Sequence, residues 1–202
     1  MTGKRKSGEE YYLGSYHPDY AKGMEKEGFE KLMDFSDQGG IILAWGRSAA
    51  LFEGVLKIKR KDAEEEFQLP FRDISSGLTQ QGLYVPGSLL KLDITLGHPL
   101  TLGMPGRIGV FSRGRPVFRT SPPVFDTDRR VIGTYPEKEV LMSGYIKGGE
   151  VIGNKAALVW MRKGKGQFVL YGFNPQFRAS TQASYKLLFN ALLLDEPEQA
   201  GP

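Results

Sequence analysis

The apolar run at residues 41–45 (IILAW) constrains the fold most, because it is short, contains no polar residue and is followed directly by glycine. Such a run is typical of a strand buried on both faces, as in a parallel sheet. The preceding segment, residues 24–38, has the spacing of one helix face, formed by Phe29, Leu32, Met33 and Ser36. Gly39 and Gly40 favour the end of that helix. Residues 44–52 then predict a sharp turn into a second helix, so this stretch has the helix–strand–helix order of an α/β fold.

The last third of the chain predicts a hairpin followed by a helix. Residues 156–161 and 167–173 are two apolar segments joined by a glycine-containing turn. Ser180 or Thr181 then caps a helix that extends to about residue 194. Its apolar face is expected to consist of Tyr185, Leu188, Phe189 and Leu192.

The middle of the chain, about residues 55–135, has a less regular pattern. Apolar and polar residues alternate over residues 90–96, which predicts a strand with one polar face. Pro-Gly and similar pairs mark turns on either side of it.

Composition excludes several classes of protein. The 202 residues include no cysteine, which rules out disulfides, thiolate zinc sites and a cysteine nucleophile. The net charge is only +4, and the basic and acidic blocks within residues 57–66 balance each other, so we expect no nucleic-acid partner. No segment approaches the roughly 20 apolar residues of a membrane span, and the N-terminus lacks the apolar core of a signal peptide. We expect tails at residues 1–14 and 196–202 around a single domain at residues 15–195.

Residues 46–50 (GRSAA) fall one position short of G-x-S-x-G, the pattern of a nucleophile elbow. A nucleophilic Ser48 would need a histidine base, usually oriented by a carboxylate. The chain has only His17 and His98, and the order Ser48, Asp93, His98 matches that of α/β-hydrolases. A serine hydrolase is therefore an alternative. Because Asp93 is expected on a strand and His98 in the turn directly after it, we favour a helix-capping role for Ser48.

Metal and cofactor sites are not expected. Two isolated histidines do not supply the closely spaced ligands of a zinc site. Asp126 and Asp128 lie in a proline-rich segment, where such residues are typical of turns.

The loop at residues 172–178 is a better candidate for binding. It leaves a buried strand and enters the last helix, and ligand sites of open α/β sheets gather at the carboxyl ends of strands. An arginine just before a helix N-terminus would add to its preference for anions. The alternative is that Phe173 and Phe177 simply pack the loop and that Arg178 pairs with a nearby carboxylate. The predicted small-ligand site consists of Gly46, Arg47, Ser48, Asn174, Gln176 and Arg178.

Several segments carry a resemblance to a known family. Residues 164–178 (GKGQFVLYGFNPQFR) and 185–192 (YKLLFNAL) resemble the C-terminal end of large bacterial zinc-carboxypeptidase-like proteins, which carry a class I glutamine-amidotransferase-like domain after the peptidase domain. Residues 39–46 (GGIILAWG), 84–90 (YVPGSLL) and 97–105 (GHPLTLGMP) also resemble that domain. The resemblance covers about residues 15–195.

This resemblance implies an α/β, flavodoxin-like three-layer sandwich, incomplete on its N-terminal side and with a β-rich insertion in the middle. It places the zinc and catalytic residues of the exported metallocarboxypeptidase in another domain. The cysteine of true amidotransferases would fall near Trp45, Gly46 and Arg47, where this chain has none. The expected function is a non-catalytic accessory or interaction domain, whose partner is the peptidase domain or a second copy that covers an open sheet edge. Carbohydrate or small-ligand binding is a further alternative.

Overall fold

The computed structural model describes residues 2–4, 10–12, 23–60, 63–114, 117–124 and 126–194. Its α-helices are α2 (Glu25–Asp37), α3 (Ser75–Gln80) and α4 (Gln182–Leu192), and its 3-10 helices are η1 (Gly46–Phe52), η2 (Pro99–Thr101) and η3 (Gly149–Ile152). Its strands are β1 (Thr2–Lys4), β2 (Glu10–Tyr12), β3 (Ile41–Trp45), β4 (Val55–Arg60), β5 (Ala63–Gln68), β6 (Phe71–Asp73), β7 (Ser88–Ile94), β8 (Arg107–Ser112), β9 (Phe118–Thr120), β10 (Thr127–Thr134), β11 (Leu141–Ser143), β12 (Ala156–Lys163) and β13 (Gly166–Tyr171).

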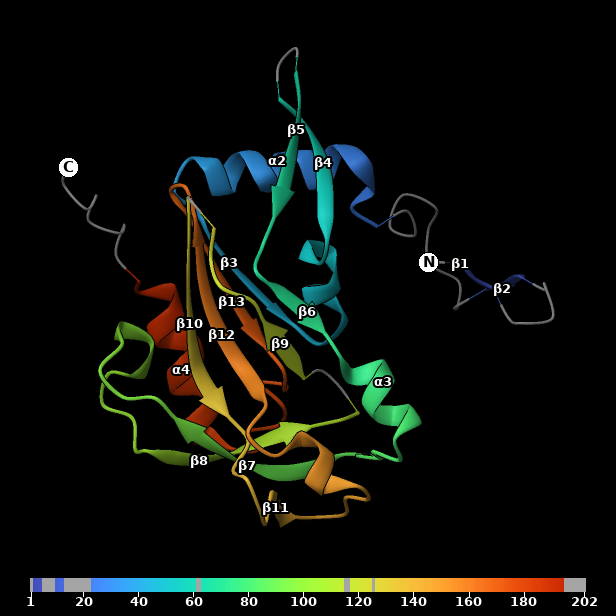
Figure 1. Cartoon of the computed structure of the whole chain (residues 1–202), viewed down its shortest axis with the longest axis vertical. Coiled ribbons are helices and arrows are strands. Elements are labelled where there is room, and N and C mark those ends of the chain that lie inside the picture. The colour runs from blue at the N-terminus through green and yellow to red at the C-terminus, as the bar shows by residue number, and fades with distance from the viewer. Residues whose placement is uncertain are drawn as a thin grey trace.

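A mixed and mainly antiparallel sheet forms the centre of the molecule (Figure 1). Its main path runs β11–β7–β10–β12–β13–β3, with β8 beside β7 and with β9 pairing both β12 and β6. Among the described strands, β13 and β3 form the one parallel pair, in which Phe168 lies opposite Ile42. In Figure 1, β7 and β8 lie across the lower ends of β10 and β12, so the sheet curls. A separate antiparallel hairpin, β4–β5, projects at the top.

The expected flavodoxin-like, amidotransferase-like sandwich is wrong. That fold is built from parallel strands linked by helices, whereas here every described strand pair except β13–β3 is antiparallel. The segment expected to be a β-rich insertion instead supplies β7, β8 and β10 to the main sheet. The parallel pairing expected for residues 41–45 is present in β3–β13, and the error lies in extending it to the rest of the sheet. The apolar hairpin β12–β13 is buried on both faces and is antiparallel.

Side chains of β13 alternate between two cores, which explains why its residues 168–171 are all apolar. Phe168 and Leu170 enter one core together with residues of α2, η1 and the β4–β5 hairpin. Val169 and Tyr171 enter the other, which includes residues of β7, β8 and α4. The hairpin β12–β13 is thus the shared wall between two apolar layers.

The helix predictions are only partly confirmed. The helices expected over residues 24–38 and 181–194 exist as α2 and α4, but the buried face of α4 is wrong. Its buried residues are Ser184, Leu187 and Ala191, whereas Phe189 is 60% and Leu192 62% exposed. Two of these three buried positions, Ser184 and Ala191, carry small side chains that let the helix lie close to the sheet, which a pattern of large apolar residues does not reveal.

The segment after β3 is a 3-10 helix rather than an α-helix. Its N-cap is Trp45 and its first residue is Gly46, so Ser48 lies inside the turn and does not cap it. The capping role expected for Ser48 is therefore wrong.

No described helix is long and apolar enough to cross a membrane. The expected tail at residues 196–202 lies outside the described residues, as does His17. Within the tail expected at residues 1–14, β1 and β2 are described and pair in antiparallel. The single domain at residues 15–195 stays a prediction.

Candidate ligand-binding site

A small cleft lies at the carboxyl ends of the parallel pair β3 and β13. Its volume is about 270 Å³, and its lining residues are Gly46, Arg47, Arg113, Gly114, Phe173 and Asn174. The three contributing segments are far apart in the sequence and meet only through the sheet. This is the kind of position that the sequence predicted for a site, although the surrounding fold differs from the expected one.

Backbone geometry explains why the cleft opens there. Gly46 has φ +57°, in the left-handed region that favours glycine, and the chain turns away from β3 at this residue. On the side of β13, the Asn174 N–H donates to the Phe111 carbonyl oxygen at 2.9 Å, which joins the loop to β8. The segment after β8 then brings Arg113 to the cleft.

The loop after β13 is held in place by packing and hydrogen bonds. The Phe177 ring stacks on Phe111, with centroids 3.8 Å apart and planes 7° from parallel. The Ser184 hydroxyl donates to the Pro175 carbonyl oxygen at 2.8 Å. Arg178 places its guanidinium carbon 5.6 Å from the centroid of the Phe177 ring. This agrees with the expectation that Phe177 packs the loop, whereas Arg178 contacts an aromatic ring instead of the carboxylate foreseen for it.

The structure therefore brings together only part of the predicted ligand set. Gly46, Arg47 and Asn174 line the cleft, but Ser48, Gln176 and Arg178 are exposed and do not. Sequence reasoning missed Arg113 and Gly114, because the pairing of β8 with β7 that carries them to this edge leaves no local sequence signal.

The charge of the cleft is positive. Arg47 and Arg113 are both exposed, and neither guanidinium has an ion pair within the part of the chain that the structure describes. The lining residues include no carboxylate. A group carrying negative charge would therefore meet a lining with two cationic residues and no carboxylate.

Asp93 and His98 do not form a catalytic arrangement with Ser48. The Asp93 carboxylate is paired with Arg107, whose Nη2 donates to Oδ2 at 3.0 Å. His98 is the N-cap of η2, where its Nδ1 accepts from the Leu100 N–H at 3.2 Å. The side chains of Asp93 and His98 thus each make a structural interaction elsewhere, and the geometry does not favour the hydrolase alternative.

The environment of His98 also favours the neutral form of its ring. Partial burial, and then the positive charge of Arg130, lower the pKa of His98 below its ordinary value of 6.5, while Asp128 opposes them. The ring lies 5.2 Å from Trp160, measured between centroids. A neutral ring suits its role as a hydrogen-bond acceptor in the cap.

Within the described residues, no group of three or more His, Cys, Asp and Glu side chains could hold a metal ion. Asp126 instead accepts a hydrogen bond from Lys163 Nζ at 2.6 Å, which lowers the pKa of its carboxyl. Asp128 accepts from the Arg129 N–H at 2.7 Å.

No family model and no curated protein matches this chain. Its structure is similar to part of a crystal structure of β-galactosidase from Bacillus circulans sp. alkalophilus, with a TM-score of 0.41 and 12% sequence identity. The match covers 83% of this chain and 20% of the β-galactosidase, so the chain spans about a fifth of that protein. The site is therefore interpreted from its own residues.

Proposed function

We propose that this chain is a non-catalytic binding module and that the cleft after β3 and β13 takes a small anionic ligand. The observation that carries the proposal is the meeting of Arg47, Arg113 and Asn174, from three distant segments, in one cleft whose lining has no carboxylate. Arginine presents a planar fork of donors that matches carboxylate and phosphate oxygens.

The size of the cleft supports a small ligand. Its volume of about 270 Å³ lies at the lower end of the usual range for ligand pockets, which begins near 300 Å³. A Cβ added at Gly46 would meet no atom within 4 Å, so the backbone there faces open space that a ligand can enter. The buried ring of Phe173 supplies an apolar wall beside the two cations.

The experiment is a titration of the protein with sodium malonate and, separately, with inorganic phosphate at constant ionic strength. Binding is followed through the ¹⁵N resonances of the arginine side chains. We expect the Nε–H signals of Arg47 and Arg113 to shift, and Arg47→Gln or Arg113→Gln to weaken binding by about 10- to 100-fold, the value of one charge-assisted hydrogen bond. Comparing the two titrations distinguishes a carboxylate ligand from a phosphate ligand.

Lys138→Gln is the matched control, because it removes one exposed positive charge outside the cleft lining. It should leave both affinities unchanged. The proposal fails if the glutamine variants at Arg47 and Arg113 bind both anions as the parent protein does.

A larger assembly is a second part of the proposal and rests only on the resemblance of residues 164–178 and 185–192. We propose that the module acts as an accessory to a zinc-carboxypeptidase-like protein. Sequencing the DNA upstream tests this. An in-frame peptidase coding region supports the association, and a stop codon with its own promoter contradicts it.

A further inference from the structure

Two arginines lie directly opposite each other on the short strand pair β6–β9. The antiparallel register places Arg72 opposite Arg119. Both side chains are exposed, while Phe71 and Phe118, at the alternate positions, are buried on the other face. Residues opposite one another in an antiparallel pair share a face, with Cβ atoms about 5 Å apart, and like charges in this arrangement destabilise the sheet.

Nothing in the described part of the chain neutralises this pair. Neither guanidinium has an ion pair among those residues. The nearest carboxylate in the sequence, Asp73, lies opposite Phe118, and its Oδ1 accepts from the Ser75 N–H at 2.8 Å. No described carboxylate forms an ion pair with Arg72 or Arg119, so apart from screening by water and salt their repulsion is relieved only when an anion binds.

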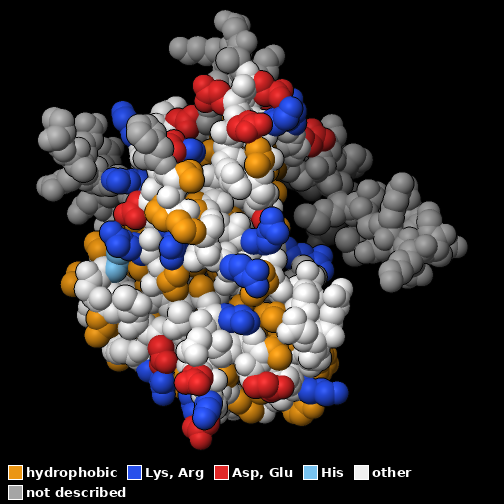
Figure 2. Space-filling view, viewed as in Figure 1, with side chains coloured by type: hydrophobic (Ala, Val, Ile, Leu, Met, Phe, Trp, Pro, Cys, Tyr) orange, Lys and Arg blue, Asp and Glu red, His pale blue; other side chains and the backbone are white. Residues whose placement is uncertain are grey.

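Arg119 also lines a second and larger cleft, separate from the one after β3. Its volume is about 570 Å³, within the range for small-molecule sites. The lining residues come from α3, β9 and the region of η3, and they are Ile74, Gly77, Leu78, Gln81, Arg119, Glu150, Val151 and Lys155. Figure 2 shows Lys and Arg side chains gathered at the centre of this face, over the region of β6 and β9 in Figure 1.

The walls of this second cleft are held in position before any ligand arrives. The Val117 N–H donates to the Ser75 Oγ at 2.7 Å, and the Ile74 N–H donates to the Val117 carbonyl oxygen at 2.9 Å. These two bonds join the start of α3 to the residue that precedes β9. Preorganisation of this kind lowers the entropy lost on binding.

We infer that the cleft between α3, β9 and η3 binds a phosphate ester. The phosphate contacts Arg119 and Lys155, with Arg72 beside them, and the organic part packs on Leu78 and Val151. Arginine forks pair with phosphate oxygens in two parallel hydrogen bonds, and the lysine adds a further positive charge. Binding the anion relieves the repulsion between the two arginines.

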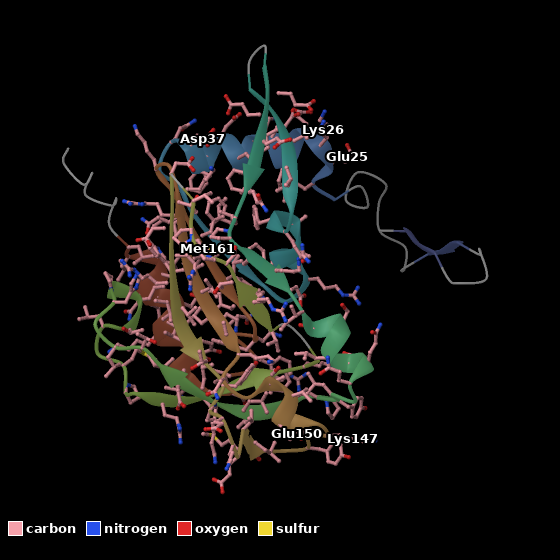
Figure 3. The ribbon with its side chains drawn as sticks, viewed as in Figure 1. Glu25, Lys26, Asp37, Lys147, Glu150 and Met161 are labelled. Atoms are coloured by element: carbon pink, nitrogen blue, oxygen red, sulfur yellow. The ribbon has the colours of Figure 1, made fainter. Side chains whose placement is uncertain are left out.

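Glu150 narrows the class of ligand. It lines the same cleft as Arg119 and Lys155, and Figure 3 labels it near Lys147 at the lower edge of this face. A carboxylate repels phosphate but accepts hydrogen bonds from hydroxyl or amino groups. The ligand is therefore a phosphate ester that also carries such donors, with its phosphate oriented away from Glu150.

The test uses glycerol 3-phosphate, which has both a phosphate and hydroxyl groups, and follows its binding by calorimetry. We expect Arg119→Gln to weaken binding by about 10- to 100-fold. We expect Glu150→Gln to strengthen the binding of inorganic phosphate. Lys138→Gln, outside both clefts, is the control and should change neither affinity.

A second measurement, thermal unfolding of the ligand-free protein, tests whether Arg72 and Arg119 serve binding or instead stabilise the fold. Because repulsion is removed, Arg72→Gln and Arg119→Gln should each raise the melting temperature of the ligand-free protein at low salt, by about 1–3 °C. The inference is overturned if either substitution lowers the melting temperature, or if Arg119→Gln binds glycerol 3-phosphate as tightly as the parent. It is also overturned if Arg47→Gln, rather than Arg119→Gln, removes binding, because the ester then occupies the cleft after β3. If Arg47→Gln loses malonate binding but still binds glycerol 3-phosphate, the result concerns the cleft after β3 and the proposed function, and not this second cleft.

Discussion

Replacing Ser184 by alanine tests how the loop beside the first cleft is held. The Ser184 side chain is fully buried in α4, and its Oγ lies 2.8 Å from the Pro175 carbonyl oxygen and 2.7 Å from the Thr181 carbonyl oxygen. Its one hydroxyl hydrogen serves these two acceptors. The Thr181 carbonyl also accepts from the Ser184 N–H at 3.2 Å, a bond that alanine keeps. The substitution therefore removes the hydrogen bond to Pro175 in particular.

The expected loss of stability in Ser184→Ala follows from the burial of the Pro175 carbonyl group. A buried carbonyl that loses its partner raises the free energy of the folded state by about 1–3 kcal/mol. Alanine fits the space left by serine and adds no cavity larger than the missing oxygen. We therefore expect Ser184→Ala to lower the free energy of unfolding by about 1–3 kcal/mol, and to lower the melting temperature by about 2–4 °C for each kcal/mol at this chain length.

Urea unfolding of the parent and of Ser184→Ala measures this loss directly. Ser48→Ala is the matched control, because it removes the hydroxyl of an exposed serine in η1 and should change stability by less than about 0.5 kcal/mol. If Ser184→Ala unfolds at the same urea concentration as Ser48→Ala, the buried hydroxyl does not hold the loop, and the reasoning is wrong. The same control variant tests the hydrolase alternative, since a fluorophosphonate probe should label parent and Ser48→Ala equally.

Three further perturbations address other parts of the molecule. Because the pKa of His98 is lowered in the folded state, its contribution to stability is complete above its ordinary pKa of 6.5 and is lost as pH falls below that value. Urea unfolding measured from pH 7.5 to 5 should show this loss of stability. His98→Asn keeps an acceptor for the Leu100 N–H but does not titrate, so the variant should lose less stability over this pH range than the parent. Phe168→Ala should lower the free energy of unfolding by about 3–5 kcal/mol, because the ring is fully buried and lies 5.3 Å from Phe52 and 5.6 Å from Phe67 between centroids; a loss below about 1 kcal/mol in urea unfolding would contradict the described core. Gly166→Ala should lower the free energy of unfolding by about 1–3 kcal/mol in the same assay, because its Cβ would overlap the Ser36 hydroxyl and lie 2.8 Å from the Ser36 carbonyl oxygen. Gly77→Ala is the control and should not lower it, because a Cβ at Gly77 would meet no atom within 4 Å.

Helices and strands could be predicted from the sequence where the spacing of apolar residues fits only one type of secondary structure. Residues 41–45 form β3, although only Ile42 and Ala44 are buried and not both faces as expected, and the hairpin and final helix of the last third are present as β12, β13 and α4. Hydrophobic period and glycine-containing turns act over a few residues, so they can be read without knowing the partners. The face of α4 was misjudged, since two of the four residues of its expected stripe, Phe189 and Leu192, are exposed to solvent.

By itself, the sequence determined that residues 41–45 and the two segments of the last third form strands, and that the turn at Gly46 and the loop at Asn174 follow two of them. Only the tertiary structure decided how the strands pair, because an unbroken apolar strand is equally well buried in a parallel or an antiparallel neighbour pair when a core lies on each face. The pairing of the strands determines which residues from distant parts of the sequence become neighbours. It brings Arg113 to Arg47 in one cleft and places Arg119 opposite Arg72 at the edge of the other. Charges separated by tens of residues have no common local pattern, so their meeting is a property of the fold alone.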